Sequence, residues 1–197
     1  MDMLKQAESI NELNELNVLK QEAQKLQGKG LPYMMASVVI WSLICLLNCM
    51  NLSVIWVNQF TFMTTCLLLP LAWIFSKLIG ADIFRKTSNP ISKLAFLCTM
   101  NQNLYLLIVM WACSKAPEAM IMLFAIVFGA HLLPFSWAYD NKAYVVIPIM
   151  ETIGALAIGC IFGGRIMSVF MIILQIALCI FLYVDVRKAN GKIESRN

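Results

Sequence analysis

Residues 143–164 read AYVVIPIMETIGALAIGCIFGG, and Glu151 is the only charged residue among them. As an α-helix this run extends about 33 Å, enough to cross the roughly 30 Å hydrocarbon core of a bilayer. The run therefore predicts a membrane-spanning helix at residues 143–163, ended by the pair Gly163-Gly164.

The rest of the chain repeats this pattern five times, with apolar runs near 31–50, 53–77, 91–113, 117–139 and 166–186. Of the 197 residues, 60% are hydrophobic and only 13% are charged, and the mean hydropathy is +0.76. This composition excludes a disordered chain, a small disulfide-linked secreted domain and an ordinary cytosolic enzyme. We expect an all-α polytopic membrane protein whose six transmembrane helices form one bundle over residues 30–188.

The basic residues predict how the bundle is oriented. With six spans, both termini lie on one side of the membrane, and 13 of the 15 lysines and arginines fall on that side. Only Lys115 and Arg165 fall on the other side. Because cytoplasmic loops are enriched in Lys and Arg, we expect both termini, including the tail 189–197, in the cytoplasm.

Residues 1–29 predict a helix of another kind, because their apolar residues recur every three or four positions between charged ones, at Ile10, Leu13, Leu16, Leu19 and Leu26. One interpretation is an amphipathic helix that lies on the cytoplasmic interface or against the bundle. The other is that residues 1–28 bind a protein partner or a second copy of the chain.

Glu151 lies about 12 Å into its span, too deep for its short side chain to reach water. At such a depth a carboxyl group is protonated, hydrogen-bonded to a partner, or exposed to a hydrated cavity. Ala155, Gly159 and Gly163 follow Glu151 at steps of four and form a small-residue ridge that another helix, or another copy, can approach closely. We therefore expect Glu151 to face the interior of the bundle, where a single satisfying hydrogen bond is the simpler alternative to a functional site.

Other polar residues also fall within the predicted spans. His131 precedes Pro134, which leaves a backbone carbonyl without its helical partner, and His131 and Glu151 are expected at similar depth. We predict a solute- or proton-binding site from Glu151, His131, Asn101, Gln102, Tyr105 and Gln175. The alternative is that these groups only hydrogen-bond neighbouring helices together.

The sequence carries no recognisable catalytic, nucleotide-binding or metal-binding motif. With one histidine and no Cys-x-x-Cys pair among seven cysteines, we expect no metal and no cofactor. Cys49 and Cys113 are both expected near the outer face, and whether they are bridged stays open. The net charge of +4 is explained by topology, so we expect no nucleic-acid partner.

Three short features resemble a family of small, uncharacterised, multi-span bacterial proteins: Gly30-Leu31-Pro32 before the first span, Asn89-Pro90 before the third, and Asn101-Gln102 within it. The resemblance implies a location in the bacterial inner membrane and carries no activity.

Taken together, the sequence favours a non-enzymatic membrane protein that binds or translocates a small solute, coupled or not to protons, through a polar cavity centred on Glu151. The alternatives are a regulatory or scaffold protein that acts through its N-terminal helix, and an intramembrane enzyme.

Overall fold

The computed structural model describes residues 2–85 and 87–194, and all secondary structure in that part of the chain is helical. The expected all-α class is confirmed. In chain order the helices are α1 (Asp2–Gln27), the short 3₁₀ helix η1 (Gly28–Gly30), α2 (Leu31–Cys49), α3 (Val54–Thr65), α4 (Leu68–Ile79), α5 (Pro90–Lys115), the 3₁₀ helix η2 (Pro117–Ala119), α6 (Met120–Leu132), α7 (Phe135–Tyr139) and α8 (Ala143–Glu194).

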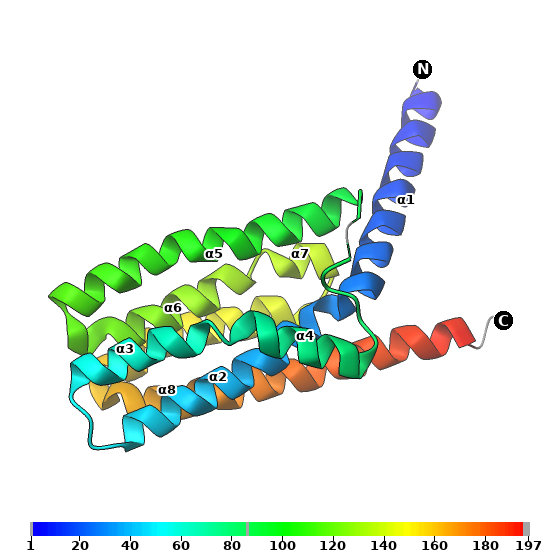
Figure 1. Ribbon diagram of the computed structural model, residues 1–197. Helices are drawn as coiled ribbons and strands as arrows, with labels where there is room; N and C mark the ends of the chain where they lie inside the picture. Colours follow the sequence, from blue (N-terminus) through cyan, green and yellow to red (C-terminus); the bar gives the residue numbers. More distant parts are fainter. Residues whose placement is uncertain (1, 86, 195–197) are drawn as a thin grey trace.

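The N-terminal helix α1 leaves the bundle at an angle, and both chain ends lie at the same end of the molecule (Figure 1). The change of direction occurs at Gly28, Lys29 and Gly30, which all have positive φ. Left-handed φ values interrupt a right-handed helix, and glycine is the residue that adopts them without cost. Helix α2 then begins at Leu31, and Pro32 lies in its first turn, where a missing N–H is tolerated.

Two of the membrane-length segments are broken at proline. Between α3 and α4 the axis bends by 41°, and Pro70 in the first turn of α4 has no N–H to donate to the carbonyl of Cys66. Between α6 and α7, Pro134 likewise leaves the carbonyl of Ala130 without its helical partner, and the N–H of Leu133 donates to it at 3.4 Å. These breaks therefore have a local covalent cause.

The 52-residue segment α8 is not straight. Gly163, with φ 75° and ψ −176°, is non-helical, and the side chains of Glu151 and Gln175 on either side of it are hydrogen-bonded at 2.5 Å. A continuous helix would separate these two residues by about 36 Å, so the chain reverses at Gly163. We call residues 143–162 the first arm of α8 and residues 164–194 its second arm.

Much of the outer surface is apolar, and several buried positions are polar. Among the most exposed large side chains are Leu104, Leu107, Trp111, Ile161, Phe162 and Ile173, whereas Ser37, Asn58, Thr61, Glu151, Ser168 and Gln175 are buried. Four helical segments are long and apolar enough to cross a membrane, or five if the bent α3–α4 pair is one span. These properties indicate a membrane protein.

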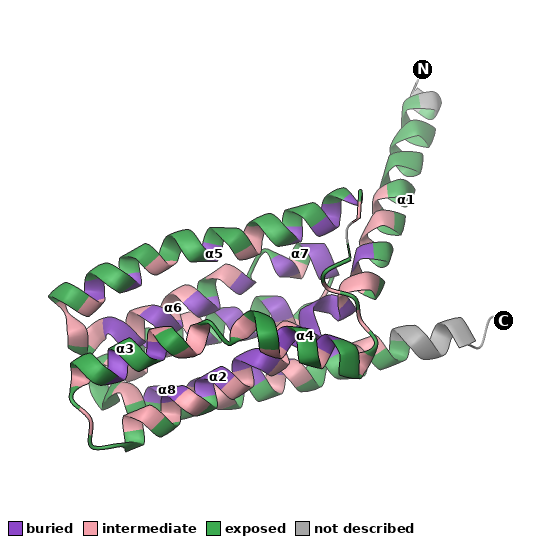
Figure 2. Cartoon of the chain, in the orientation of Figure 1, coloured by how far each residue is buried: buried purple, intermediate pink, exposed green. Residues whose placement is uncertain are grey.

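The helices pack in two groups around α8. Helices α2 and α6 both lie along α8, while α4 packs mainly on α2 and α5 mainly on α6. Trp41 of α2 fills the centre, with its ring 5.4 Å from that of Phe124 and 5.9 Å from that of Phe128. Buried residues line the inward faces, and α5 exposes most of its outer side (Figure 2). Because α4 and α5 rest on different partners, space is left between them.

The N-terminal segment is helical as α1, its predicted amphipathic role stays a prediction, and its apolar residues lie in two different environments. Ile10 and Leu13 are exposed, whereas Ala23 is buried and Leu16 and Leu19 pack partly against the bundle. Lys86 and Arg196, which counted toward the predicted orientation, and residues 195–197 of the predicted tail lie outside the described residues.

The reversal at Gly163 yields a prediction for stability. A side chain at its φ and ψ costs about 1–3 kcal/mol, so Gly163→Val should lower the thermal unfolding temperature of the detergent-purified protein. The control is Ala157→Val, an exposed position in the helical first arm. Equal unfolding temperatures for the two variants would contradict a turn that depends on Gly163.

Candidate functional site

A cavity of about 640 Å³ lies between α4 and α5 and extends inward to α6 and α7. Its lining also includes residues of the segment between α4 and α5, the start of α2 and Tyr144 at the start of α8. Most lining residues are apolar or aromatic. The cavity therefore occupies the space left by the separate packing of α4 and α5.

Three polar side chains in this lining have hydrogen-bonding capacity that no described residue satisfies. Ser92 is 4% exposed and its Oγ has no hydrogen-bond partner. Gln102 is 9% exposed, and no hydrogen bond to its side-chain amide occurs among the described residues. The Nδ1 of His131 lies against the carbonyl oxygen of Phe128, so in a neutral ring Nδ1 carries the hydrogen and Nε2 can accept a hydrogen bond. Because buried polar groups are normally paired, these groups are candidates to contact a ligand.

A second, smaller cavity of about 80 Å³ adjoins Gln102, which lines both spaces. Its other lining residues include Ser37 and Trp41 of α2 and Phe128 of α6. Gln102 is thus placed between the large cavity and the centre of the bundle.

Glu151 is fully buried and is joined to this second cavity by hydrogen bonds. Gln175 donates from Nε2 to Glu151 Oε1 at 2.5 Å, and Ser37 donates from Oγ to Gln175 Oε1 at 2.6 Å. The other carboxyl oxygen of Glu151 has no hydrogen-bond partner. Glu151 lines neither cavity itself, but a chain of polar side chains leads from it to Ser37.

Small residues allow the helices to meet around Glu151. A Cβ at Gly129 of α6 would lie 2.9 Å from Glu151 Cβ, and a Cβ at Gly159 would lie 2.4 Å from Met122. Ala155 is completely buried. Glu151, Ala155 and Gly159 therefore face the interior and pack on α6, while Gly163 forms the reversal.

The six residues predicted from the sequence fall into three places. Glu151 and Gln175 form the buried pair, and Gln102 and His131 line the large cavity. Asn101 donates to the hydroxyl of Tyr105 at 2.9 Å on the exposed face of α5. His131 and Glu151 bond to Phe128 and Gln175 respectively, and the described contacts do not pair them.

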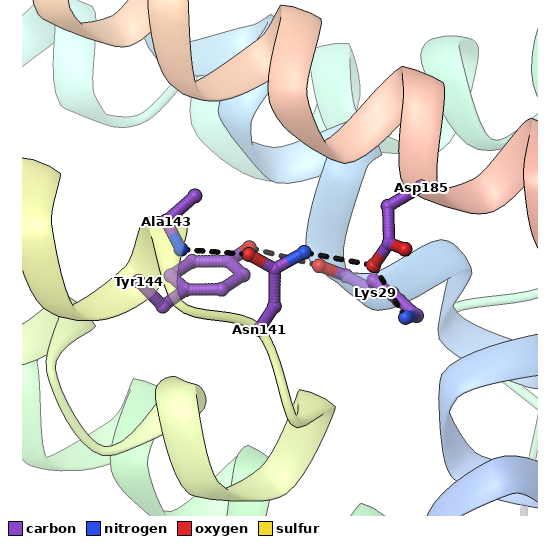
Figure 3. A network of polar contacts seen from close by, with 5 residues as sticks. All are labelled: Lys29, Asn141, Ala143, Tyr144 and Asp185. Atoms are coloured by element: carbon purple, nitrogen blue, oxygen red, sulfur yellow. Dashed lines mark hydrogen bonds and ion pairs between the residues drawn. The ribbon is translucent and has the colours of Figure 1, made fainter.

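A polar network joins residues at the end of the bundle where both termini lie (Figure 1), and Figure 3 shows its contacts. Lys29 forms an ion pair with Asp185 at 2.6 Å, and Asn141 donates to the same carboxylate at 2.8 Å. Tyr144 donates from its hydroxyl to the carbonyl oxygen of Lys29. A Cβ at Gly30 would lie 2.8 Å from that hydroxyl, so only glycine fits there. The network links η1, the α7–α8 turn and the second arm of α8.

This network and the roles of Ser37 and Ser92 were not found by sequence reasoning. Lys29 and Asp185 are 156 residues apart, and neither has a local neighbour that would indicate its partner. Serines in membrane spans are common, so Ser37 and Ser92 carry no distinctive signal either.

All seven cysteines are free, including Cys49 and Cys113. Across residues 2–85 and 87–194, no group of three or more His, Cys, Asp or Glu side chains is arranged to hold a metal ion.

Comparison with known sequences places the chain in a family. The profile of a family of unknown function (DUF7010) matches residues 16–185, and the chain belongs to this family. The expected membership of an uncharacterised family is thereby confirmed. No curated protein and no solved structure matches the chain significantly.

The buried pair yields a prediction. Gln175→Leu removes the one hydrogen-bond donor that Glu151 has among the described residues and should destabilise the protein by about 1–3 kcal/mol, because a buried acceptor is left unsatisfied. Glu151→Gln keeps an acceptor oxygen and should cost less. Thermal unfolding in detergent measures both, with Gln59→Leu on the exposed face of α3 as the control. If Gln175→Leu and Gln59→Leu unfold alike, the pair does not stabilise the bundle.

Proposed function

We propose that this protein is a non-enzymatic membrane protein that binds, and passes across the membrane, a small molecule held in the cavity between α4 and α5. The observation that carries the proposal is the cavity of about 640 Å³, whose mostly apolar lining includes the buried and unpartnered Ser92 hydroxyl together with Gln102 and His131. Small-molecule sites typically measure roughly 300–1,000 Å³, and combine an apolar wall with a few polar groups. Ser92, Gln102 and His131 would orient the ligand.

We further propose that movement of the ligand is linked to a proton at Glu151. Glu151 connects to the small cavity through Gln175 and Ser37, and Gln102 connects that cavity to the large one. An ionisable residue in a membrane interior is costly and commonly has a role in solute or proton movement. Asn101 and Tyr105, on the outer face, have no part in this path.

The proposed topology has six spans: α2, α3 with α4, α5, η2 with α6 and α7, and the two arms of α8. Support comes from the reversal at Gly163 and from the position of both termini at one end (Figure 1). We propose that this end is cytoplasmic, because the basic residues gather there, and that the membrane is the bacterial inner membrane.

A role in binding is favoured over catalysis because Ser92, Gln102 and His131 are not hydrogen-bonded to one another among the described contacts. An enzyme of acyl transfer would need a nucleophile paired with a base.

The second candidate function is partner binding by α1, which is favoured by its projection from the bundle and by the exposed Ile10 and Leu13.

Cysteine labelling tests the cavity without knowledge of the ligand. The variant Ser92→Cys, treated with N-ethylmaleimide in the detergent-purified protein, should react about tenfold faster than Thr61→Cys, which is also buried but lines neither of the two cavities described above. Mass spectrometry of the labelled peptides separates these thiols from the native ones.

Adding Thr99→Trp, which fills the cavity, should slow the reaction of Ser92→Cys. Leu107→Trp on the exposed face of the same helix should not. Equal rates for Ser92→Cys and Thr61→Cys would remove the main support for the proposal.

Proton flux tests the role of Glu151. Liposomes with trapped pyranine would receive organic acids, amino acids, nucleosides and alkylsulfonates one at a time, with protein-free liposomes subtracted. At least one compound should trigger flux with the wild-type protein, and Glu151→Gln should abolish that flux because the amide holds no titratable proton. Asn101→Leu, on the outer face of α5, should retain it. Flux unchanged in Glu151→Gln would refute the proton linkage.

A further inference from the structure

We propose that the ligand of the large cavity is a single-chain amphiphile with an anionic head, bound with its head at Arg85 and Lys93 and its chain between α4 and α5. This inference rests on the proposed function and names the chemical class of the ligand. Three independent properties of the cavity support it: its charge, its shape and its side opening.

The charges in the lining are all positive. Arg85, in the segment after α4, and Lys93, in the first turn of α5, both line the cavity, and the lining contains no Asp or Glu. Neither side chain forms an ion pair among the described residues, in contrast to Lys29, which is paired with Asp185. Two cations without a counter-charge at one end of an apolar cavity match an anionic group.

A buried hydroxyl lies next to these cations in the sequence. Ser92 directly precedes Lys93, is 4% exposed and has no hydrogen-bond partner for its Oγ. A carboxylate or phosphate oxygen at Lys93 would be an acceptor for this hydroxyl. The cationic end of the cavity therefore also offers a neutral donor.

The remainder of the cavity suits an apolar chain. From Lys93 to Gln102 the lining follows α5 for ten residues, which places these two residues about 13.5 Å apart along the helix axis. Opposite lie Leu68 and Leu69 at the start of α4. Gln102 and His131 line the inner end of the cavity. There they would contact the far end of the ligand's apolar chain, or a polar group that the chain carries.

The cavity opens toward the surrounding lipid. Leu69 on one edge and Phe96 and Leu97 on the other line the cavity and are also strongly exposed on the outer surface. A chain can enter sideways between α4 and α5 without leaving an apolar environment. A volume of about 640 Å³ falls in the range of sites that enclose one drug-sized molecule, which is the size class of a single-chain amphiphile.

Photolabelling in proteoliposomes tests the head charge. The probe is a fatty acid with a diazirine in its chain, compared with its methyl ester and with an analogue carrying a trimethylammonium head. The acid should label peptides from residues 68–69 and 92–102, and the other two should label them at most a tenth as strongly. A two-chain phosphatidylglycerol with the same diazirine chain should also label them weakly.

Arg85→Gln combined with Lys93→Gln should lower labelling by the acid about tenfold to thirtyfold, because each basic group near the membrane surface contributes about fivefold to the attraction. The matched control is Lys77→Gln with Lys142→Gln. It removes two positive charges from the same end of the bundle, outside the cavity lining.

The outcomes test three parts of the proposal separately: the anionic head, the single chain and binding in the cavity. Equal labelling by acid and ester, or no effect of the Arg85 and Lys93 variant, overturns the anionic head. Strong labelling by phosphatidylglycerol overturns the single chain. Thr99→Trp and Met100→Trp test whether the probe binds in the cavity at all, and the unfolding temperature of each variant shows that it is folded. If either variant blocks labelling, binding in the cavity is supported whatever the two results above. If neither does, binding in the cavity is refuted.

Discussion

The hydrogen bond between Gln175 and Glu151 connects the two arms of α8 across the reversal at Gly163. A carboxyl group inside hydrocarbon must be paired or neutralised, and this bond supplies a partner to one of its oxygens. It also sets the relative register of the arms. Ser37 of α2 donates to the same Gln175, and Gly129 of α6 allows close approach to Glu151. The two helices that lie along α8 are therefore positioned around one polar contact.

The cavity follows from that arrangement. Helices α2 and α6 both pack on α8, while α4 packs mainly on α2 and α5 packs mainly on α6. The prolines shape the inner boundary, because Pro70 bends the α3–α4 segment and Pro134 divides α6 from α7. The network of Lys29, Asp185, Asn141 and Tyr144 closes the end of the bundle. Each element that bounds the cavity is therefore held in place by interactions of its own.

Local sequence signals predict the helices well for physical reasons. An asparagine directly before a proline is typical of a helix N-terminus, and the side chain of Asn89 accepts from the N–H groups of Ile91 and Ser92 at the start of α5. At the start of α2, Gly30 is the N-cap residue and Pro32 lies in the first turn, where proline is common in helices. The interior position of Glu151 was also predictable, because small residues follow it at steps of four. Such signals depend on a few neighbouring residues, and they can therefore be read from the sequence without knowledge of the fold.

The polar site was less predictable because its members meet across the bundle. Three consecutive amides at 101–103 point in different directions on α5, and only the packing of α5 on α6 decides that Gln102 lines both cavities while Asn101 bonds to the exposed Tyr105. Ser37 and Ser92 are recognised as parts of the site only from their contacts and burial in the folded structure. Arg85 and Lys93 counted in the sequence simply as charges that orient the chain.

The sequence by itself determined that this is an all-helical protein with membrane-length apolar helices and one carboxyl group set deep within them, because hydropathy and helical periodicity are properties of short segments. Tertiary structure alone decided that Glu151 pairs with Gln175, that Lys29 pairs with Asp185, and that the space between α4 and α5 is a cavity with cations at its edge. These facts depend on which helix faces come together, and that is set by packing over the whole bundle.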